Sequence, residues 1–162
     1  MIAVCNTSPI SNLIQISALP LFERLFARVY VPPEVVAELE EGADIFGDWR
    51  AAPGASIVQI RTITNQLLSR DLSANLHPGE AAAITLAAET AGAVLVIDEA
   101  DGRRAAARIG VRITGTVGIL VAAKGRGHVQ LVAPLLEDLR AKAHFWISDD
   151  IIRRARELAG EA

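Results

Sequence analysis

The fold of this 162-residue chain is decided by residues 94–101, which read VLVIDEAD. Four apolar residues, three of them β-branched, run directly into a cluster of three carboxylates, and Gly92 and Gly102 bound the stretch. A short apolar run between turn residues is typical of a central strand covered on both faces. In open parallel sheets, ligands bind just beyond the carboxyl ends of the strands. The stretch therefore places Asp98 in a candidate site, although an acid after a strand is about as often a solvated turn residue or a helix cap.

Short apolar runs alternate with helical patterns on both sides of this stretch. The predicted strands cover residues 1–5, 28–31, 56–60, 94–97 and 111–113, with a short further candidate at 145–147. The predicted helices cover residues 9–17, 19–26, 33–41, 63–73, 78–91, 102–109, 116–124, 129–142 and 149–159. This alternation predicts an α/β fold with a short parallel sheet of four to five strands and helices on both faces. We expect one domain over residues 1–162, because no repeat or linker divides the chain.

The composition favours a cytoplasmic protein. The net charge of −3 carries no global signature of a nucleic-acid binder. The single cysteine, Cys5, excludes an internal disulfide and suits a reducing compartment. No apolar run approaches the length that a membrane span needs, and no secretory leader pattern opens the chain.

Several common catalytic motifs are absent. The chain has no glycine motif for phosphate or dinucleotide binding and no G-x-S-x-G elbow. Its three histidines are far apart in sequence with no cysteine near them, which argues against a structural zinc site. Polar residues expected at the carboxyl edge of the sheet remain as candidates, and these are Asn6, Ser8, Glu38, Glu80, Asp98 and Asp101.

Convergence of these acids would imply a metal ion. Mg²⁺ and Mn²⁺ prefer oxygen ligands, and clustered carboxylates repel one another unless a cation or protons compensate them. Each acid also has a simpler interpretation. Glu80 could interact with a helix dipole, Glu38 could lie on a solvated face, and Asp101 could cap a helix. Glu99 is predicted to be a solvated side chain.

Four segments resemble, in the right order, the motifs of PIN-domain ribonucleases. They are residues 3–14 (AVCNTSPISNLI), 31–39 (VPPEVVAEL), 79–84 (GEAAAI) and 94–98 (VLVID). Two later segments, residues 113–127 and 145–149, look like a VapC-related branch of these proteins. The resemblance covers nearly the whole chain.

The resemblance implies a PIN fold and a Mg²⁺- or Mn²⁺-dependent endoribonuclease. Such proteins are commonly the toxin of a type II toxin–antitoxin pair in a prokaryote, so a cognate antitoxin and a homodimer are the implied partners. By this resemblance Glu38, Glu80 and Asp98 hold the metal, directly or through water. Ser8 or Thr7 would orient a ligand or a water. Position alone suggests four contacts to RNA phosphates, namely Arg103, Arg104, Lys124 and Arg126.

The chain departs from the family pattern at Asn6, where the family has an aspartate after the first strand. An amide oxygen can coordinate a hard cation but brings no charge. Either Asp101 supplies the missing charge, or the chain is a weak or inactive PIN module that binds RNA or a protein partner. An unrelated phosphohydrolase or receiver-like domain is disfavoured, because it needs an aspartate at this position as nucleophile or phosphoacceptor.

Overall fold

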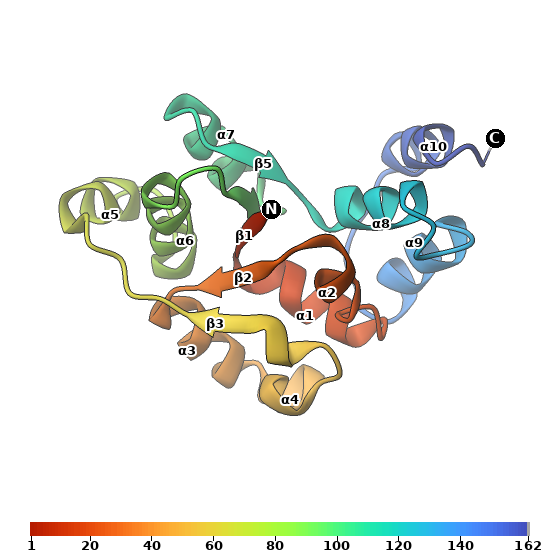
Figure 1. The fold of residues 1–162 in the computed structure, drawn as a ribbon, viewed down its shortest axis with the longest axis horizontal. Coiled ribbons are helices and arrows are strands. Elements are labelled where there is room, and N and C mark those ends of the chain that lie inside the picture. The colour runs from red at the N-terminus through yellow and green to blue at the C-terminus, as the bar shows by residue number, and fades with distance from the viewer. Residues whose placement is uncertain (162) are drawn as a thin grey trace.

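A five-stranded parallel sheet forms the centre of the computed structural model, which describes residues 1–161. Its strand order is β3-β2-β1-β4-β5 (Figure 1). The strands are β1 (Ile2–Cys5), β2 (Arg28–Val31), β3 (Val58–Ile60), β4 (Val94–Val96) and β5 (Arg112–Thr114). The predicted α/β fold with four to five parallel strands and flanking helices is therefore confirmed.

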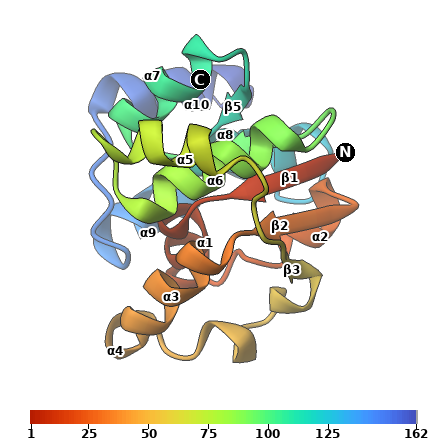
Figure 2. The ribbon, with the colours of Figure 1, turned by 90° about the vertical axis from the view of Figure 1, so that its left-hand side faces the viewer.

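Helices fill the connections between the strands and the region after β5. The α-helices are α1 (Thr7–Gln15), α2 (Leu21–Leu25), α3 (Pro33–Glu41), α4 (Ala43–Phe46), α5 (Gln66–Ser73), α6 (Pro78–Glu89), α7 (Ala100–Arg108), α8 (Thr116–Gly125), α9 (Ala133–Ala141) and α10 (Asp149–Leu158). Two short 3₁₀ turns, η1 (Trp49–Ala51) and η2 (Ala55–Ile57), precede β3. Figures 1 and 2 show α5, α6 and α7 on one face of the sheet and α1 and α8 on the other.

The strand order opens a crevice between β1 and β4. These neighbouring strands pair in parallel, with Val4 opposite Leu95. From β1 the chain continues toward β2 at one side of the sheet, and from β4 it continues toward β5 at the other side. Because such crossovers are right-handed, the helices that follow β1 and β4 lie on opposite faces of the sheet. The space beyond the carboxyl ends of these two strands is therefore left open for a site.

Helix α6 is buried over almost its whole surface. It packs against β1 and β4 and also against α3, α5 and α7. Small side chains make this possible, since Ala81, Ala82 and Ala83 have no exposed surface. The one buried hydroxyl in the helix, that of Thr85, donates a hydrogen bond of 2.8 Å to the Ala81 carbonyl. This packing fixes the first turn of α6, which carries Glu80, beside the crevice.

Two predicted helices begin later than expected. The helix predicted over residues 129–142 begins only at Ala133. Pro134 lies in its first turn, which is the part of a helix that tolerates proline, and it therefore marks the start. The helix predicted over residues 63–73 begins at Gln66, after a side-chain cap at the preceding residue. Both helices end within one residue of the predicted position, so the differences are confined to their first turns and do not reach the crevice.

Candidate functional site

The crevice brings together polar residues that follow β1 and β4. The Asn6 backbone amide extends the ladder by donating a hydrogen bond of 3.0 Å to the Val96 carbonyl. Asp98 and Glu99 follow β4 directly, so their carboxylates lie beside the exit of β1. Sequence positions more than ninety residues apart thus share one site.

Asp98 is held in place by the first turn of α8. Its Oδ1 accepts a hydrogen bond of 2.7 Å from the Thr116 backbone amide, and its Oδ2 accepts one of 2.6 Å from the Thr116 hydroxyl. The Asn12 side-chain amide donates a longer bond of 3.4 Å to Oδ2. Burial raises the pKa of Asp98; the bonds from Thr116 lower it, and the negative charge of Glu99 raises it further. The carboxylate is therefore rigidly oriented in a region of concentrated negative charge.

Glu99 belongs to the site, and its prediction as a solvated side chain was wrong. One carboxylate oxygen accepts a hydrogen bond of 3.1 Å from the Asn6 side-chain amide, and the other accepts one of 2.5 Å from the Ser8 hydroxyl. The second acid after the strand was expected to point into solvent. The chain instead turns into α7 at Glu99, so Asp98 reaches toward α8 and Glu99 toward the start of α1.

Glu38 and Glu80 complete the group of acids from α3 and α6. Glu38 accepts a hydrogen bond from the Thr7 hydroxyl and one of 3.0 Å from the Gly79 backbone amide. Glu80 is 7% exposed, and its Oε1 accepts a weak bond of 3.4 Å from the His77 amide. Burial raises the pKa of Glu80, and the charges of Glu99 and Glu38 raise it further. Four carboxylates therefore influence one another across the crevice.

Three glycines leave room for these carboxylates. A Cβ at Gly102 would lie 2.8 Å from Glu80 Oε2, and a Cβ at Gly115 would lie 2.8 Å from Asp98 Oδ1. A Cβ at Gly79 would collide with the Glu38 carboxylate. None of the three has a positive φ angle, so the backbone conformation does not require glycine here. A larger residue would instead disturb the close packing against an acid.

Among the other predicted site residues, Arg103 lies beside these acids, and Asp101 lines a hollow next to them. Asp101 and Arg104 form an exposed ion pair with each other on α7. Lys124 forms an ion pair with Glu161 at 3.3 Å. Lys124 lies near the end of α8, roughly 12 Å along the helix from its first turn.

Two basic residues are held by backbone carbonyls in different parts of the fold. Arg126 donates a hydrogen bond of 3.1 Å to the Leu25 carbonyl, away from the acids. Arg103 donates one of 2.8 Å to the Ile97 carbonyl, and its guanidinium lowers the pKa of Asp98. Arg103 is therefore the predicted basic residue that lies beside the acids.

Two hollows flank the acids. One of about 480 Å³ is lined by residues that include His77, Glu80, Glu99 and Asp101. The other, of about 420 Å³, has Asp98 and Arg103 in its lining. Solvent and ligands can thus approach the acids from both sides.

The donors present are suited to a hard divalent cation. Among residues 1–161, no three Asp, Glu, His or Cys side chains are arranged to coordinate one ion together. Asn6 Oδ1 and Glu80 Oε2, however, are buried oxygens without a hydrogen-bond partner in that part of the chain. Mg²⁺ is commonly bound by only one or two carboxylates and retains several waters. Oxygen donors in a crevice with four carboxylates match this requirement.

In the described part of the chain, no helix is long and apolar enough to cross a membrane.

Comparison with known proteins identifies the family. Searches of curated proteins and of solved structures returned no match. The family model described as DUF3368, a PIN domain, matches residues 2–161. Together with the parallel sheet and the acidic crevice between β1 and β4, this match shows that the chain belongs to the PIN-domain family.

Proposed function

We propose that this protein is a Mg²⁺- or Mn²⁺-dependent endoribonuclease that hydrolyses RNA phosphodiester bonds. PIN domains are commonly nucleases and generally use divalent metal ions. The observation that carries the proposal is the pair of buried, unpartnered oxygens, Asn6 Oδ1 and Glu80 Oε2, in a crevice where Glu99 raises the pKa of neighbouring carboxylates. Buried polar oxygens without a partner are costly, and a bound cation would relieve that cost.

In this proposal Glu38, Glu80, Asp98 and Asn6 hold the ion, directly or through water. Glu99 supplies the charge that Asn6 lacks, because it lies against the Asn6 side chain whereas Asp101 is exposed and paired with Arg104. When bound, the ion lowers the pKa of a coordinated water and neutralises charge that develops on the phosphoryl oxygens.

The surrounding residues position these groups. The Thr7 and Ser8 hydroxyls donate to Glu38 and Glu99, so each orients a carboxylate as a ligand-supporting group does in metal sites. The guanidinium of Arg103, which lies beside Asp98, would pair with a phosphate oxygen of the RNA. Its charge would also offset the repulsion between the acidic crevice and the RNA backbone.

Cleavage assays with the purified protein test this function. The protein should cleave RNA in Mn²⁺ or Mg²⁺, and EDTA should stop cleavage. Asp98→Asn keeps the shape of the side chain but removes its charge, so the rate should fall by about 100-fold or more. Asp44→Asn is the matched control, since Asp44 is exposed on α4, outside the group of acids, and its replacement should leave the rate unchanged. Equal cleavage by Asp98→Asn would reveal a contaminating nuclease and overturn the proposal.

We further propose that the nuclease acts in the prokaryotic cytoplasm as the toxin of a type II toxin–antitoxin pair, as a homodimer and as one domain over residues 1–162. The support is the likeness of residues 113–127 and 145–149 to VapC-related PIN proteins. A small DNA-binding protein encoded beside the gene should co-purify with the chain and inhibit cleavage. If the neighbouring frames encode no such inhibitor, the toxin role is rejected while the nuclease assignment stands.

A second candidate function rests on Asn6. The Asn6 amide is uncharged and donates a hydrogen bond to Glu99, so the site carries one negative charge fewer than an aspartate at this position would give. This arrangement favours a weak or inactive PIN module that binds RNA or a protein partner. RNA binding without cleavage in either metal, with normal binding by Asp98→Asn, would support this alternative.

A further inference from the structure

An exposed tryptophan lies at the entrance to the second hollow of the candidate site. The Trp146 side chain is 81% exposed, more than any other large apolar side chain in the described chain, whereas Trp49 is 4% exposed. Trp146 lines the hollow of about 420 Å³ that also has Asp98 and Arg103 in its lining. The indole is therefore available to a ligand that enters this hollow.

The segment that carries Trp146 is held firmly in place. Residues 145–147 do not form the short strand considered from the sequence. The Phe145 amide donates a hydrogen bond of 3.0 Å to the Leu139 carbonyl, and Arg140 Nε donates one of 3.0 Å to the Ile147 carbonyl. Ile147 is only 2% exposed. The two neighbours of Trp146 are thus anchored, and the indole between them is presented to solvent by a fixed backbone.

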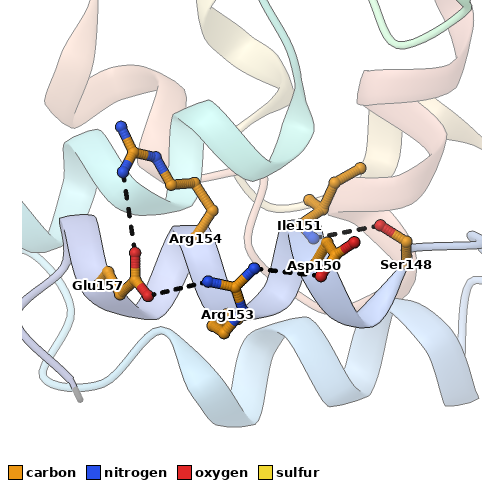
Figure 3. Close-up of polar contacts among 6 residues, drawn as sticks. All are labelled: Ser148, Asp150, Ile151, Arg153, Arg154 and Glu157. Atoms are coloured by element: carbon orange, nitrogen blue, oxygen red, sulfur yellow. Dashed lines mark hydrogen bonds and ion pairs between the residues drawn. The ribbon is translucent and has the colours of Figure 1, made fainter.

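Helix α10 secures the other end of this segment. Figure 3 shows the Ser148 hydroxyl accepting the hydrogen bond from the Ile151 amide, 3.2 Å long, at the first turn of the helix. It also shows Arg153 between Asp150 and Glu157, at 3.2 and 3.3 Å. The cap, Ser148, fixes where α10 begins, three residues after Trp146. A side chain presented by such a preorganised segment loses little conformational entropy when it binds.

The hollow has the size and chemistry of a site for one nucleotide. Its volume falls at the low end of the range for small-molecule sites. Its lining includes the Arg103 guanidinium, a cation that can pair with a phosphate, and the indole of Trp146, an apolar ring. Unpaired bases in single-stranded nucleic acid stack on such rings, whereas bases within a duplex are already stacked on one another.

We propose that Trp146 stacks on an unpaired base next to the phosphate bound at Arg103, and that this stacking supplies a large part of the affinity of this protein for single-stranded RNA. This inference rests on RNA as the substrate of the proposed function. An unpaired base is the favoured occupant, because the hollow that holds the indole also holds the Arg103 guanidinium, which can pair with the phosphate of the same nucleotide.

Binding in EDTA tests the stacking separately from cleavage. Labelled single-stranded RNA should bind the unaltered chain, and Trp146→Ala should weaken binding by about ten-fold or more. Trp146→Phe, which keeps an aromatic ring, should restore most of the affinity. Ile45→Ala is the control, since Ile45 is 76% exposed on α4 and does not line the hollow. A duplex of the same sequence should bind more weakly to the unaltered chain and should be insensitive to Trp146→Ala.

Fluorescence gives a second measurement. In Trp49→Phe the indole of residue 146 is the only one left, and single-stranded RNA should quench its emission. If Trp49→Phe fails to fold, Trp146→Ala supplies the same comparison, because the quenching should disappear with it.

The outcomes separate this inference from the proposed function. Single-strand binding that changes less than two-fold in Trp146→Ala overturns the stacking, even if Asp98→Asn abolishes cleavage. Trp146-dependent binding without metal-dependent cleavage overturns the nuclease and leaves the stacking intact. Quenching that depends on protein concentration alone, without RNA, would identify the indole as a self-association contact and overturn the inference.

Discussion

At the scale of single residues, Asn6 sets the charge of the site. Its side chain donates to Glu99, and its own oxygen is buried without a partner among the described residues. Asn6→Asp would replace the donor by a charge facing Glu99. In EDTA this should lower the free energy of unfolding by about 1–3 kcal/mol, because a buried hydrogen bond is lost and like charges are opposed. In Mn²⁺ the same charge should tighten metal binding, measured by calorimetry.

Gln66→Glu is the control for this prediction, because it makes the same amide-to-acid change on an exposed side chain of α5. It should change neither quantity appreciably. Equal metal affinity in Asn6→Asp and the unaltered chain would contradict the assignment of Asn6 as a ligand position.

Glu80 makes the metal-free protein sensitive to pH. The pKa of Glu80 is raised in the folded state, mainly by burial. The folded chain therefore holds its proton at pH values where the unfolded chain has lost it. The stability that this group contributes is present below its unfolded pKa of about 4.3 and is lost as pH rises through the raised pKa.

Glu80→Gln should remove this dependence. Urea unfolding in EDTA between pH 4 and 8 should show a smaller loss of stability in the variant, which should be the more stable form at pH 7. A steeper loss in the variant would mean that burial does not disfavour the charged form. Saturating Mn²⁺ should bring the two proteins closer together, because the cation compensates the charge of the native carboxylate.

At the scale of elements, the start of α8 has to approach Asp98 closely. A Cβ at Gly115 would lie 2.8 Å from Asp98 Oδ1 and 3.0 Å from Arg103 Nη1. Gly115→Ala should displace the carboxylate and reduce Mn²⁺ affinity by about ten-fold, the effect expected when a ligand loses its orientation. Calorimetry and the cleavage rate check this outcome.

Gly125→Ala, at the other end of the same helix, is the matched control. Nothing lies within 4 Å of a Cβ at Gly125, so the change should leave metal binding intact. It should also stabilise the protein slightly, since alanine is favoured over glycine in helices by about 0.5–1 kcal/mol. Equal losses of affinity in both variants would show that α8 responds as a whole and not through contact with Asp98.

The elements also show where sequence patterns are reliable. The strands at residues 1–5 and 94–97 were recognisable because a buried parallel strand is a short apolar run between turn residues. The start of α9 was misplaced by four residues, since Val129, Leu131 and Val132 continue the apolar pattern before the helix. Only the backbone shows that the first turn, which contains Pro134, begins at Ala133.

At the scale of the whole molecule, metal binding should stabilise the fold. The acids come from α3, α6 and the β4–α7 connection, so an ion held among them exists only in the folded chain. At a hundred times its Kd, Mn²⁺ should add about 2.7 kcal/mol to the free energy of unfolding. For a chain of this size the expected rise in Tm is about 5–10 °C.

Asp98→Asn should abolish most of this rise, whereas Asp44→Asn should keep it. A rise of the same size in both variants would show that Mn²⁺ binds elsewhere on the protein. The measurement needs no RNA, so it tests the metal site independently of nuclease activity.

The sequence by itself determined the five strands of the sheet to within two residues, that they pair in parallel, and that Asp98 follows a buried strand. These properties follow from local patterns of apolar residues and turns. Only the tertiary structure decided that β1 and β4 are neighbours, that Glu99 turns toward Asn6, and that Trp146 remains exposed beside Asp98. The reason is physical. Strand order and side-chain direction depend on contacts between residues far apart in the chain, and no local pattern of residues encodes those contacts.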